Sequence, residues 1–348
     1  MSPAREVAFR VLQRVHSGGY ASDLLRLESE RLTQRDAGLA EIIVFGCLRY
    51  QSQLDYLTAH FSGRGALKLD PEVRIALRMG IYQLRYLDRV PAHAAVAESV
   101  ELVKRARKQS AAGLVNAVLR KVDRRPMQWP DQATALSVPA WMLARWQAHY
   151  GAEAAKIARA ALDEPLHSVN PATGREQDIG SQSIVPLLAL EPGMLLLDLC
   201  AAPGNKTAQA LASGARVIAC DRYLRRLEEV PPAAGRVVLD ATEPLPFASR
   251  FDRILVDAPC SGTGTLARNP EIKWRLQPGD LPVFQSRQRK ILQRALDHLV
   301  PGGRLVYATC SLEPEENEEV VAGLDPLQTE LRLPGRDPGD GFFAAVIR

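Results

Sequence analysis

The sequence lacks the features of a membrane or secreted protein. Its 348 residues contain no run of about 18 uncharged apolar residues, and the opening stretch MSPAREVAFRVLQRV carries charges through its apolar part. These absences argue against a membrane span and against a signal peptide. We therefore expect a cytoplasmic protein without a membrane partner.

Cysteine and histidine are also scarce. The five cysteines are widely spaced with no CxxC pair, which argues against a disulfide framework and a zinc site. The six histidines show no metal-ligand spacing, so we expect reduced thiols and no metal. With 46% hydrophobic residues the chain is too apolar for disorder, and its length predicts two or three domains.

The small net charge of +4 conceals an asymmetry. Residues 1–150 hold 22 Lys and Arg against 14 Asp and Glu, whereas residues 151–348 hold 22 against 26. The first half is therefore the candidate binder of a polyanion. Its basic cluster suits contact with an RNA backbone, although its helical spacing also fits an ordinary solvated face. The cluster comprises Lys104, Arg105, Arg107, Lys108, Arg120, Lys121, Arg124 and Arg125.

Hydrophobic periodicity predicts a multidomain chain. Between residues 4 and 123 the apolar residues recur at helical spacing, and a smaller helical stretch follows Pro126. Residues 165–182 are polar and rich in turn formers, which makes them a plausible boundary. We predict an all-α domain over residues 1–125, a helical linker with a small subdomain over 126–182, and a third domain over 183–348.

The third domain alternates short apolar strands with helices. Such alternation predicts an α/β fold with a parallel sheet and crossover helices. The expected strands are Met194 to Leu199, Val217 to Cys220, Val237 to Leu239, Ile254 to Val256, Leu305 to Ala308 and Ala344 to Ile347.

A turn of small residues follows the first of these strands. In a doubly wound sheet this turn lies where ligands bind, and the next helix offers free N–H groups. The sequence lacks GxGxxG and GxxxxGK[ST], so S-adenosylmethionine, which has a ribose but no pyrophosphate, suits the turn better than a dinucleotide or a nucleoside triphosphate. The predicted cofactor loop is Cys200, Ala201, Ala202, Pro203, Gly204, Asn205 and Lys206.

Acids after later strands complete the predicted cofactor site. Asp221 ends the second strand, where it can accept hydrogen bonds from both ribose hydroxyls, and Asp240 after the third strand can hold the adenine end. Asp257, after the fourth strand, is expected beside the cofactor and the substrate. Each acid alone also fits a solvated loop. Together with the turn, they favour a cofactor site.

Two cysteines lie just beyond strand ends at the same edge of the predicted sheet. They are Cys260 in DAPCSG and Cys310 in TCS, and both should face the cofactor. Flanking Pro, Ser and Gly indicate loops, which often carry chemistry. In contrast, Cys47, Cys200 and Cys220 are embedded in apolar sequence and are expected to fill the core.

A thiol beside a methyl donor favours methylation of cytosine C5. That carbon is too weak a nucleophile to take a methyl group, but a thiolate added to C6 makes the ring electron-rich. The resulting enamine attacks the methyl group, a base removes the C5 proton, and elimination frees the enzyme. An acid such as Asp257, near N3 or N4 of the base, can offset the developing charge.

Five ordered motifs resemble those of RNA 5-methylcytosine methyltransferases: LDLCAAPGNKT, VDAPCSGTG, NPEIKWRL, PGGRLVYATCS and ENEEVV. The resemblance implies a Rossmann-like class I methyltransferase domain. It also implies that Cys310 is the nucleophile and that Cys260 assists product release. Lys206 and Asp257 match residues that the family uses around the cofactor and the target base.

The front of the chain carries a second resemblance. GGYASDLL, VFGCLRY and LRMGIYQL are similar to the NusB-like RNA-binding domain. Joined to this catalytic core, that domain is the arrangement of the ribosomal small-subunit methyltransferase B family (RsmB/Sun), which the chain resembles over nearly its whole length. The resemblance implies S-adenosyl-L-methionine as cofactor and a cytosine of 16S rRNA as target.

The sequence departs from that family in two places. Asn205 stands where the family usually has a second glycine, and asparagine tolerates left-handed backbone angles. Between Val169-Asn170 and Gln177-Asp178 the family normally has several dozen more residues of a small RNA-contacting subdomain, of which only a handful remain. Part of the usual RNA platform is therefore missing.

Other interpretations remain open at this point. The RNA substrate can be a tRNA, or the chain can be a non-catalytic NusB-like RNA-binding factor, against which the retained Lys206, Asp257, Cys260 and Cys310 argue. Methylation of an oxygen or an exocyclic nitrogen would not need a thiol. Trp274 and Arg275 in NPEIKWRL can shape the target pocket, or the tryptophan can pack into a core. We expect a monomer.

Overall fold

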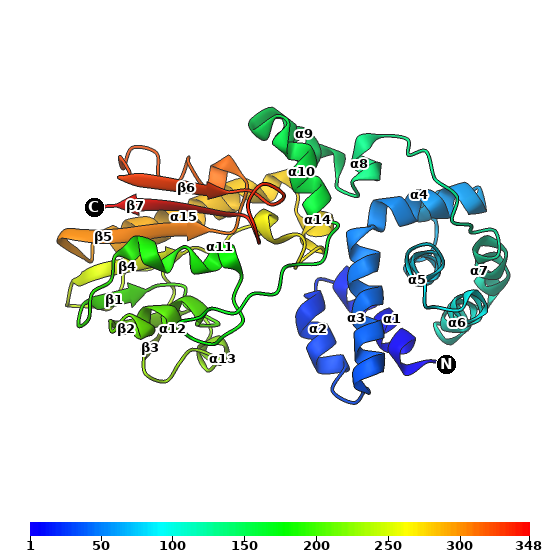
Figure 1. Ribbon diagram of the computed structural model, residues 1–348, viewed down its shortest axis with the longest axis horizontal. Coiled ribbons are helices and arrows are strands. Elements are labelled where there is room, and N and C mark those ends of the chain that lie inside the picture. The colour runs from blue at the N-terminus through cyan, green and yellow to red at the C-terminus, as the bar shows by residue number, and fades with distance from the viewer. The chain divides into compact units, whose positions relative to one another are not determined.

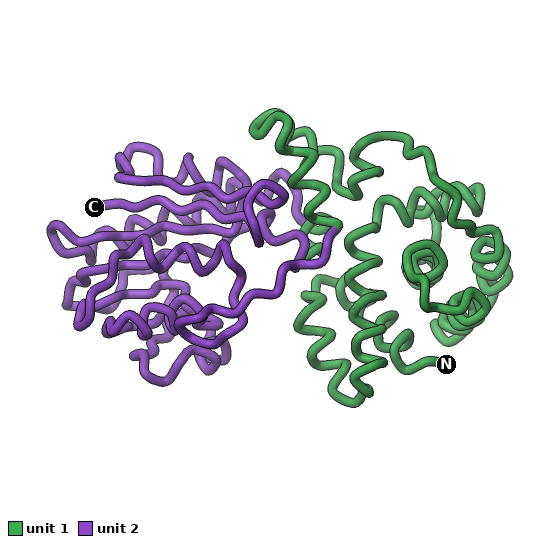
Figure 2. The backbone as a smooth tube through the Cα atoms, viewed as in Figure 1, with its two compact units in different colours: residues 1–162, 269–275 green, residues 163–268, 276–348 purple.

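The computed structural model describes all 348 residues and divides them into two compact units (Figure 2). Unit 1 comprises residues 1–162 and 269–275, and unit 2 comprises residues 163–268 and 276–348. None of the helices combines the length and the apolarity that crossing a bilayer requires.

Unit 1 is built from helices, as the periodicity predicts. Helix α5 begins at Pro71, directly after Asp70, and at the start of α3 the hydroxyl of Thr33 accepts a hydrogen bond from the backbone N–H of Asp36. The α-helices are α1 (Pro3–His16), α2 (Ala21–Glu28), α3 (Gln34–Arg49), α4 (Gln51–Ser62), α5 (Pro71–Tyr86), α6 (Ala92–Arg105), α7 (Ala112–Leu119), α8 (Gln132–Ala135), α9 (Ala140–Tyr150), α10 (Glu153–Ala160) and α14 (Ile272–Arg275).

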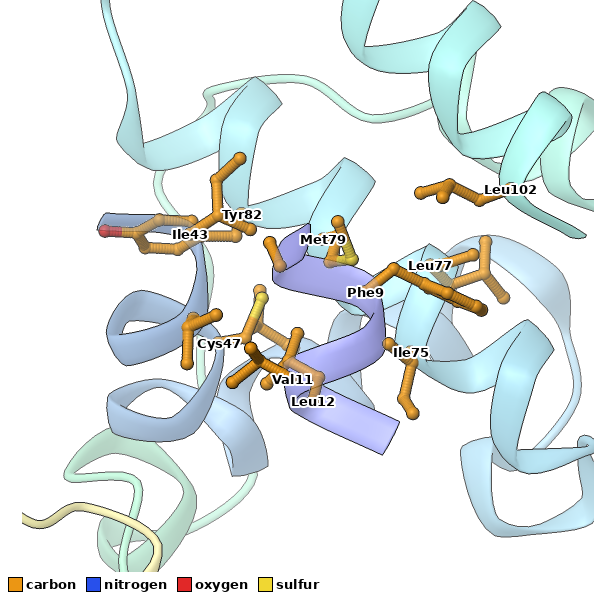
Figure 3. Close-up of a cluster of buried hydrophobic side chains, with 14 of the residues drawn as sticks. Phe9, Val11, Leu12, Ile43, Cys47, Ile75, Leu77, Met79, Tyr82 and Leu102 are labelled. Atoms are coloured by element: carbon orange, nitrogen blue, oxygen red, sulfur yellow. The ribbon is translucent and has the colours of Figure 1, made fainter. Parts of the chain in front are cut away.

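The core of unit 1 forms where α1, α3 and α5 meet (Figure 3). Phe9, Cys47 and Leu77, one from each of these helices, are buried together there. Gly46 allows the close approach of α3 and α5, because a Cβ at this position would lie 1.9 Å from a ring carbon of Tyr82. Burial raises the pKa of the Cys47 thiol, which is therefore an inert core residue as expected.

Helix α14 packs within unit 1, although it lies between catalytic motifs in the sequence. The indole N–H of Trp274 donates to the Leu48 carbonyl at 2.7 Å. The buried Lys273 ammonium donates to the Arg49 and Ser137 carbonyls at 2.9 and 2.8 Å, and burial, with a smaller effect of the Arg49 charge, lowers its pKa to about 7. Trp274 packs against the core of unit 1, which favours the core interpretation over the target pocket, and Arg275 donates to the carbonyls of Val15 and Gly19 in the same unit.

Unit 2 contains a seven-stranded sheet of order β3-β2-β1-β4-β5-β7-β6 (Figure 1). Strands β1 to β5 pair in parallel, as the alternation of strands and helices predicts. The strands are β1 (Leu195–Asp198), β2 (Arg216–Asp221), β3 (Gly235–Val238), β4 (Phe251–Asp257), β5 (Leu299–Thr309), β6 (Gln328–Arg332) and β7 (Phe342–Ile347).

One edge of the sheet departs from the parallel arrangement that the alternation predicts. Strand β7 runs antiparallel to both β5 and β6. Strand β6, with the sequence QTELR, was not predicted, because it is an edge strand with exposed polar residues and gives no apolar run.

Helices cover both faces of this sheet. The side chains of neighbouring residues alternate between two cores, so that Ile254 packs in one core with Ile291 of α15, whereas Leu255 packs in the other with Ala210 of α12. The order of the strands reverses between β1 and β4, which places a ligand crevice at their carboxyl ends. The α-helices of unit 2 are α11 (Ile179–Gln182), α12 (Asn205–Ala212), α13 (Leu224–Leu227) and α15 (Leu281–Leu296).

Candidate active site

A cavity of about 850 Å³ opens at the carboxyl ends of β1, β2, β4 and β5. Its volume is typical of small-molecule sites. One wall comes from α15, which contributes Val283, Arg287 and Lys290. Seven residues expected from the sequence to form the site line this cavity. They are Cys200, Ala202, Asp221, Asp240, Asp257, Cys260 and Cys310.

The turn between β1 and α12 contributes Cys200 and Ala202 to the lining of the cavity. Gly204 has a φ of +97°, and a Cβ there would lie 2.8 Å from the Cα of Val230, so both its angle and its surroundings require glycine. Asn205 does not need the left-handed conformation expected for it, because Gly204 adopts it. Asn205 is the first residue of α12, and its side-chain amide donates to the Glu176 carbonyl at 3.1 Å. Of the predicted cofactor loop only Cys200 and Ala202 line the cavity, and Ala201, Pro203, Gly204, Asn205 and Lys206 do not.

The two acids expected to bind the nucleoside both lie at the cavity wall. Asp221 is 4% exposed, accepts from the backbone N–H of Tyr223 at 3.0 Å and pairs with Arg226 at 3.1 Å. Asp240 accepts from the hydroxyl and the N–H of Thr242, and these hydrogen bonds lower its pKa. In each acid, Oδ1 already accepts two hydrogen bonds, whereas Oδ2 pairs with one arginine and keeps a lone pair that can accept from a ligand hydroxyl or amine. These acceptors fit the ribose hydroxyls and the adenine amine of S-adenosylmethionine.

A partly buried ion pair lies beside the reaction space. The Lys206 ammonium contacts a carboxylate oxygen of Asp257 at 2.8 Å and lies 5.3 Å from the centre of the Phe342 ring. Burial alone would lower the pKa of Lys206, but the charge and hydrogen bond of Asp257 outweigh it and raise that pKa. Lys206 is therefore a permanent cation that fixes the Asp257 carboxylate.

The two cysteine sulfurs lie 3.4 Å apart. The hydrogen bond with Cys310, together with burial and nearby negative charge, raises the pKa of Cys260 well above its usual range. Cys260 therefore remains a protonated thiol that can donate to the sulfur of Cys310. Of the other cysteines, Cys220 is buried as expected, whereas Cys200 is partly exposed at the cavity wall.

The residues that follow the two cysteines meet at a buried carboxylate that the sequence reasoning missed. Ser261 and Ser311 both donate to Glu316, which belongs to the short 3-10 helix η6 (Pro314–Glu316). The only sequence signal was the acid-rich stretch directly after TCS, whose ENEEVV motif carried a resemblance but no role. No group of three or more His, Cys, Asp or Glu is arranged to hold a metal ion.

Asp198 at the end of β1 is a second buried acid, and it predicts a pH-dependent stability. It is 0% exposed and accepts from the Thr207 hydroxyl at 2.7 Å, and burial raises its pKa from 3.8 to about 7. Between these pH values the unfolded chain loses this proton and the folded chain keeps it. Stability is therefore lost as pH rises through this window, at about 1.4 kcal/mol per pH unit.

Asp198→Asn should remove this loss. Calorimetry of the full chain should show that the melting temperature of the variant rises relative to that of the wild type between pH 5 and pH 8. In the wild type the buried carboxyl must either stay protonated above its unfolded pKa or carry a buried charge, whereas the asparagine amide does not titrate. Asp252→Asn, at the other end of the sheet, is the matched control. An equal difference between variant and wild type at both pH values would contradict this explanation.

A doubly wound sheet with strand order 3-2-1-4-5-7-6, a small-residue turn after β1 and an acid at the end of β2 defines a class I, S-adenosylmethionine-dependent methyltransferase. Two family models match the chain, "16S rRNA methyltransferase RsmB/F" over residues 185–348 and "NusB family" over residues 2–124. The chain belongs to the RsmB/F family of 16S rRNA methyltransferases and carries a NusB-type domain before its catalytic domain.

Individual relatives align with the chain over nearly its full length. The chain is 32% identical over 416 residues to "Ribosomal RNA small subunit methyltransferase B" of Escherichia coli O127:H6 (strain E2348/69 / EPEC), covering 97% of this chain and 96% of the relative. The protein of the same name from Escherichia coli O1:K1 / APEC is 31% identical over 423 residues, covering 99% and 98%. Because this chain has only 348 residues, these relatives contain segments that it lacks.

Solved structures share the fold. The structure titled "Crystal Structure of PH0851" superposes with a TM-score of 0.81 at 19% identity and covers 100% of this chain and 99% of its own. A methyltransferase homolog protein from Pyrococcus horikoshii has a TM-score of 0.53 at 23% identity, covering 64% of this chain and 99% of its own. In this chain, the expected place of the missing subdomain is a tight turn, closed by a bridge between Val169 and Glu176.

Proposed function

We propose that this enzyme methylates C5 of a cytosine in 16S rRNA through a covalent cysteine adduct. The observation that carries the proposal is the pair of sulfurs, 3.4 Å apart, in the wall of a cavity that also contains the Asp257 carboxylate. A methyltransferase acting on oxygen or an exocyclic nitrogen has an existing lone pair to alkylate and has no use for two adjacent thiols.

Cys310 takes the role of nucleophile in this proposal. Its sulfur adds to C6 of the flipped cytosine, and the bond electrons move toward C5 and N3. Asp257, held in place by Lys206, lies where it can hydrogen-bond N3 or N4 and offset the charge that develops there. The electron-rich C5 then takes up the methyl group. Loss of the C5 proton and breakage of the bond between sulfur and C6 release the product.

Cys260 suits the second half of the reaction. Its raised pKa keeps it protonated beside Cys310, so it does not compete as a nucleophile. A protonated thiol at 3.4 Å can hydrogen-bond the sulfur of Cys310 as that sulfur leaves C6. We therefore assign Cys260 to product release, in agreement with the role that the family resemblance implies.

S-adenosylmethionine supplies an activated methyl group when bound. We propose that Asp221 binds the ribose hydroxyls and Asp240 the adenine end, since both carboxylates face the cavity. The small residues of the loop, Ala201, Ala202, Pro203 and Gly204, allow the backbone to approach the ligand, with Cys200 and Asn205 at its two ends. Asp257 is shared between the cofactor and the target base.

The choice of 16S rRNA follows from the family and from the basic helical unit. The relatives carry the name of a small-subunit rRNA methyltransferase, and a NusB-type domain precedes the catalytic one. Several cations of the basic cluster in unit 1 form ion pairs, for example Lys108 with Asp70 and Arg124 with Asp88. Arg107, Arg120 and Lys121 form none, which leaves them available for RNA phosphates.

Labelled methyl transfer with nucleotide mapping tests the proposal. We expect the full chain with labelled S-adenosylmethionine to place 5-methylcytosine in unmodified 16S rRNA, supplied as naked RNA and as small subunits. Unmodified tRNA serves as the comparison substrate. If only tRNA is modified, the proposed substrate is wrong and the proposed reaction stands. A label on an oxygen or an exocyclic nitrogen would refute the proposed reaction.

A further inference from the structure

We propose that Glu316 is a positioning residue that sets the distance between the two cysteine thiols. Its side chain is 0% exposed and hydrogen-bonds neither cysteine, although its charge is one of the causes of the raised pKa of Cys260. It acts through Ser261 and Ser311, each of which directly follows a cysteine in the sequence. One buried carboxylate thus connects the loop after β4 to the loop after β5.

Four hydrogen bonds converge on this carboxylate. One oxygen accepts from the backbone N–H of Ser261 at 2.8 Å and from the side-chain amide of Gln288 in α15 at 2.9 Å. The other accepts from the hydroxyls of Ser261 and Ser311. A buried carboxylate needs such donors because no water replaces them, and hydrogen bonds to a charged acceptor are stronger than those between neutral groups.

The geometry fits positioning better than general stabilisation of the fold. No cation pairs with Glu316, so its charge is balanced only by groups on the cysteine loops and on α15. The serine hydroxyls also lie 3.1 Å from each other, one residue after two sulfurs that lie 3.4 Å apart. The position of one thiol relative to the other therefore depends on this carboxylate.

Other contacts join the same loops, so loss of the carboxylate should loosen them without separating them. The backbone N–H of Gly264 donates to the Cys310 carbonyl at 2.9 Å, and that of Leu312 donates to the Thr263 hydroxyl at 2.8 Å. We therefore expect displacement of the thiols within a folded protein. A displacement of about 1 Å at a reacting group can cost about 100-fold in rate.

Thiol oxidation measures this distance without RNA or cofactor. Diamide takes two electrons and two protons from two thiols, which join as a disulfide while the diamide becomes a hydrazine. In the full chain, we expect diamide to form the Cys260–Cys310 disulfide rapidly, as quantified by mass spectrometry of the linked peptides. We expect at least about 10-fold slower disulfide formation in Glu316→Gln. The milder double variant Ser261→Ala with Ser311→Ala should show the same slowing, because looser loops lower the effective concentration of one thiol around the other.

Tyr307→Phe is the matched control. The Tyr307 hydroxyl is equally buried and donates to the backbone carbonyl of Glu316 at 2.6 Å, so its loss removes a hydrogen bond from the same turn and keeps the carboxylate. The control should oxidise at the wild-type rate. An unchanged or faster rate in Glu316→Gln and in the double serine variant, or an equal slowing in Tyr307→Phe, would overturn the proposal.

A kinetic measurement links the geometry to catalysis, and this part rests on the proposed function. Glu316→Gln should lower kcat by about 10- to 100-fold and leave the KM for RNA and the Kd for S-adenosylmethionine unchanged, because the carboxylate touches neither ligand. An unchanged kcat, or parallel losses in all three quantities, would refute positioning. If the wild type makes no 5-methylcytosine, the proposed function fails, and the oxidation rates still decide the role of Glu316.

Discussion

Cys310→Ala is expected to abolish methyl transfer to cytosine completely. Without the thiolate no adduct forms at C6, and C5 stays too weak a nucleophile to accept a methyl group. The loss should appear in kcat, while cofactor binding measured by calorimetry stays within about twofold of wild type, because the proposed ribose and adenine contacts come from Asp221 and Asp240. Cys47→Ala, a buried change in unit 1, controls for general damage.

Cys260→Ala should give a different defect from the same assay. The adduct still forms and takes the methyl group, but its release from Cys310 slows, so a protein–RNA complex that resists denaturing electrophoresis accumulates. Methylation of cytosine C5 by Cys310→Ala would refute our choice of nucleophile. If the complex accumulates in Cys310→Ala and not in Cys260→Ala, Cys260 is the nucleophile and Cys310 assists product release.

The second large effect is expected for Asp257→Asn. This change removes the proposed stabilisation of charge on the base and leaves the buried Lys206 without its carboxylate partner at 2.8 Å. Removal of a single charge-stabilising group in an active site typically costs about 100- to 1,000-fold in kcat, and we expect a loss of this size. Methyl transfer under saturating RNA and cofactor measures it.

Asp252→Asn provides a matched control on the same strand. Its carboxylate accepts from the backbone N–H of Leu195 at 2.8 Å, at the amino end of β4 and far along the strand from the cavity. It should affect stability and leave kcat unchanged. The single variant Lys206→Met and the double variant Lys206→Met with Asp257→Asn complete a double-mutant cycle for the losses in kcat. Additive losses would show that the ion pair does not act as a unit.

Much of the candidate site could be predicted because parallel strands bring their carboxyl ends to one edge. Asp221, Asp257 and Cys310 come from three different strands, and their positions just after apolar runs were sufficient to place them around one cavity. The spacing between atoms could not be read in this way. The contact between the two sulfurs depends on loop conformation, which hydrophobic periodicity does not report.

The failures have identifiable causes. Strand β6 lacks an apolar face of its own at the edge of the sheet, so it carries no pattern to detect. Glu316 was missed because a buried acid looks like a solvated one in sequence, and only its four donors reveal its burial. For Trp274 the sequence left two environments open, and its packing and its hydrogen bond to the Leu48 carbonyl favour the core. The expected domain boundaries near residues 125 and 182 stay predictions.

The path of the chain through α14 limits how this protein can be divided. Unit 1 is discontinuous, since residues 269–275 return to it after most of the sheet has been built. A fragment ending at residue 162 would lack Lys273 and Trp274, which hydrogen-bond and pack against its helices. A fragment beginning at residue 163 would expose a tryptophan and a lysine whose partners were left behind. Exchange of either half between homologues by recombination at a single junction should therefore yield poorly folded chimeras, unless α14 is exchanged together with the helices that enclose it.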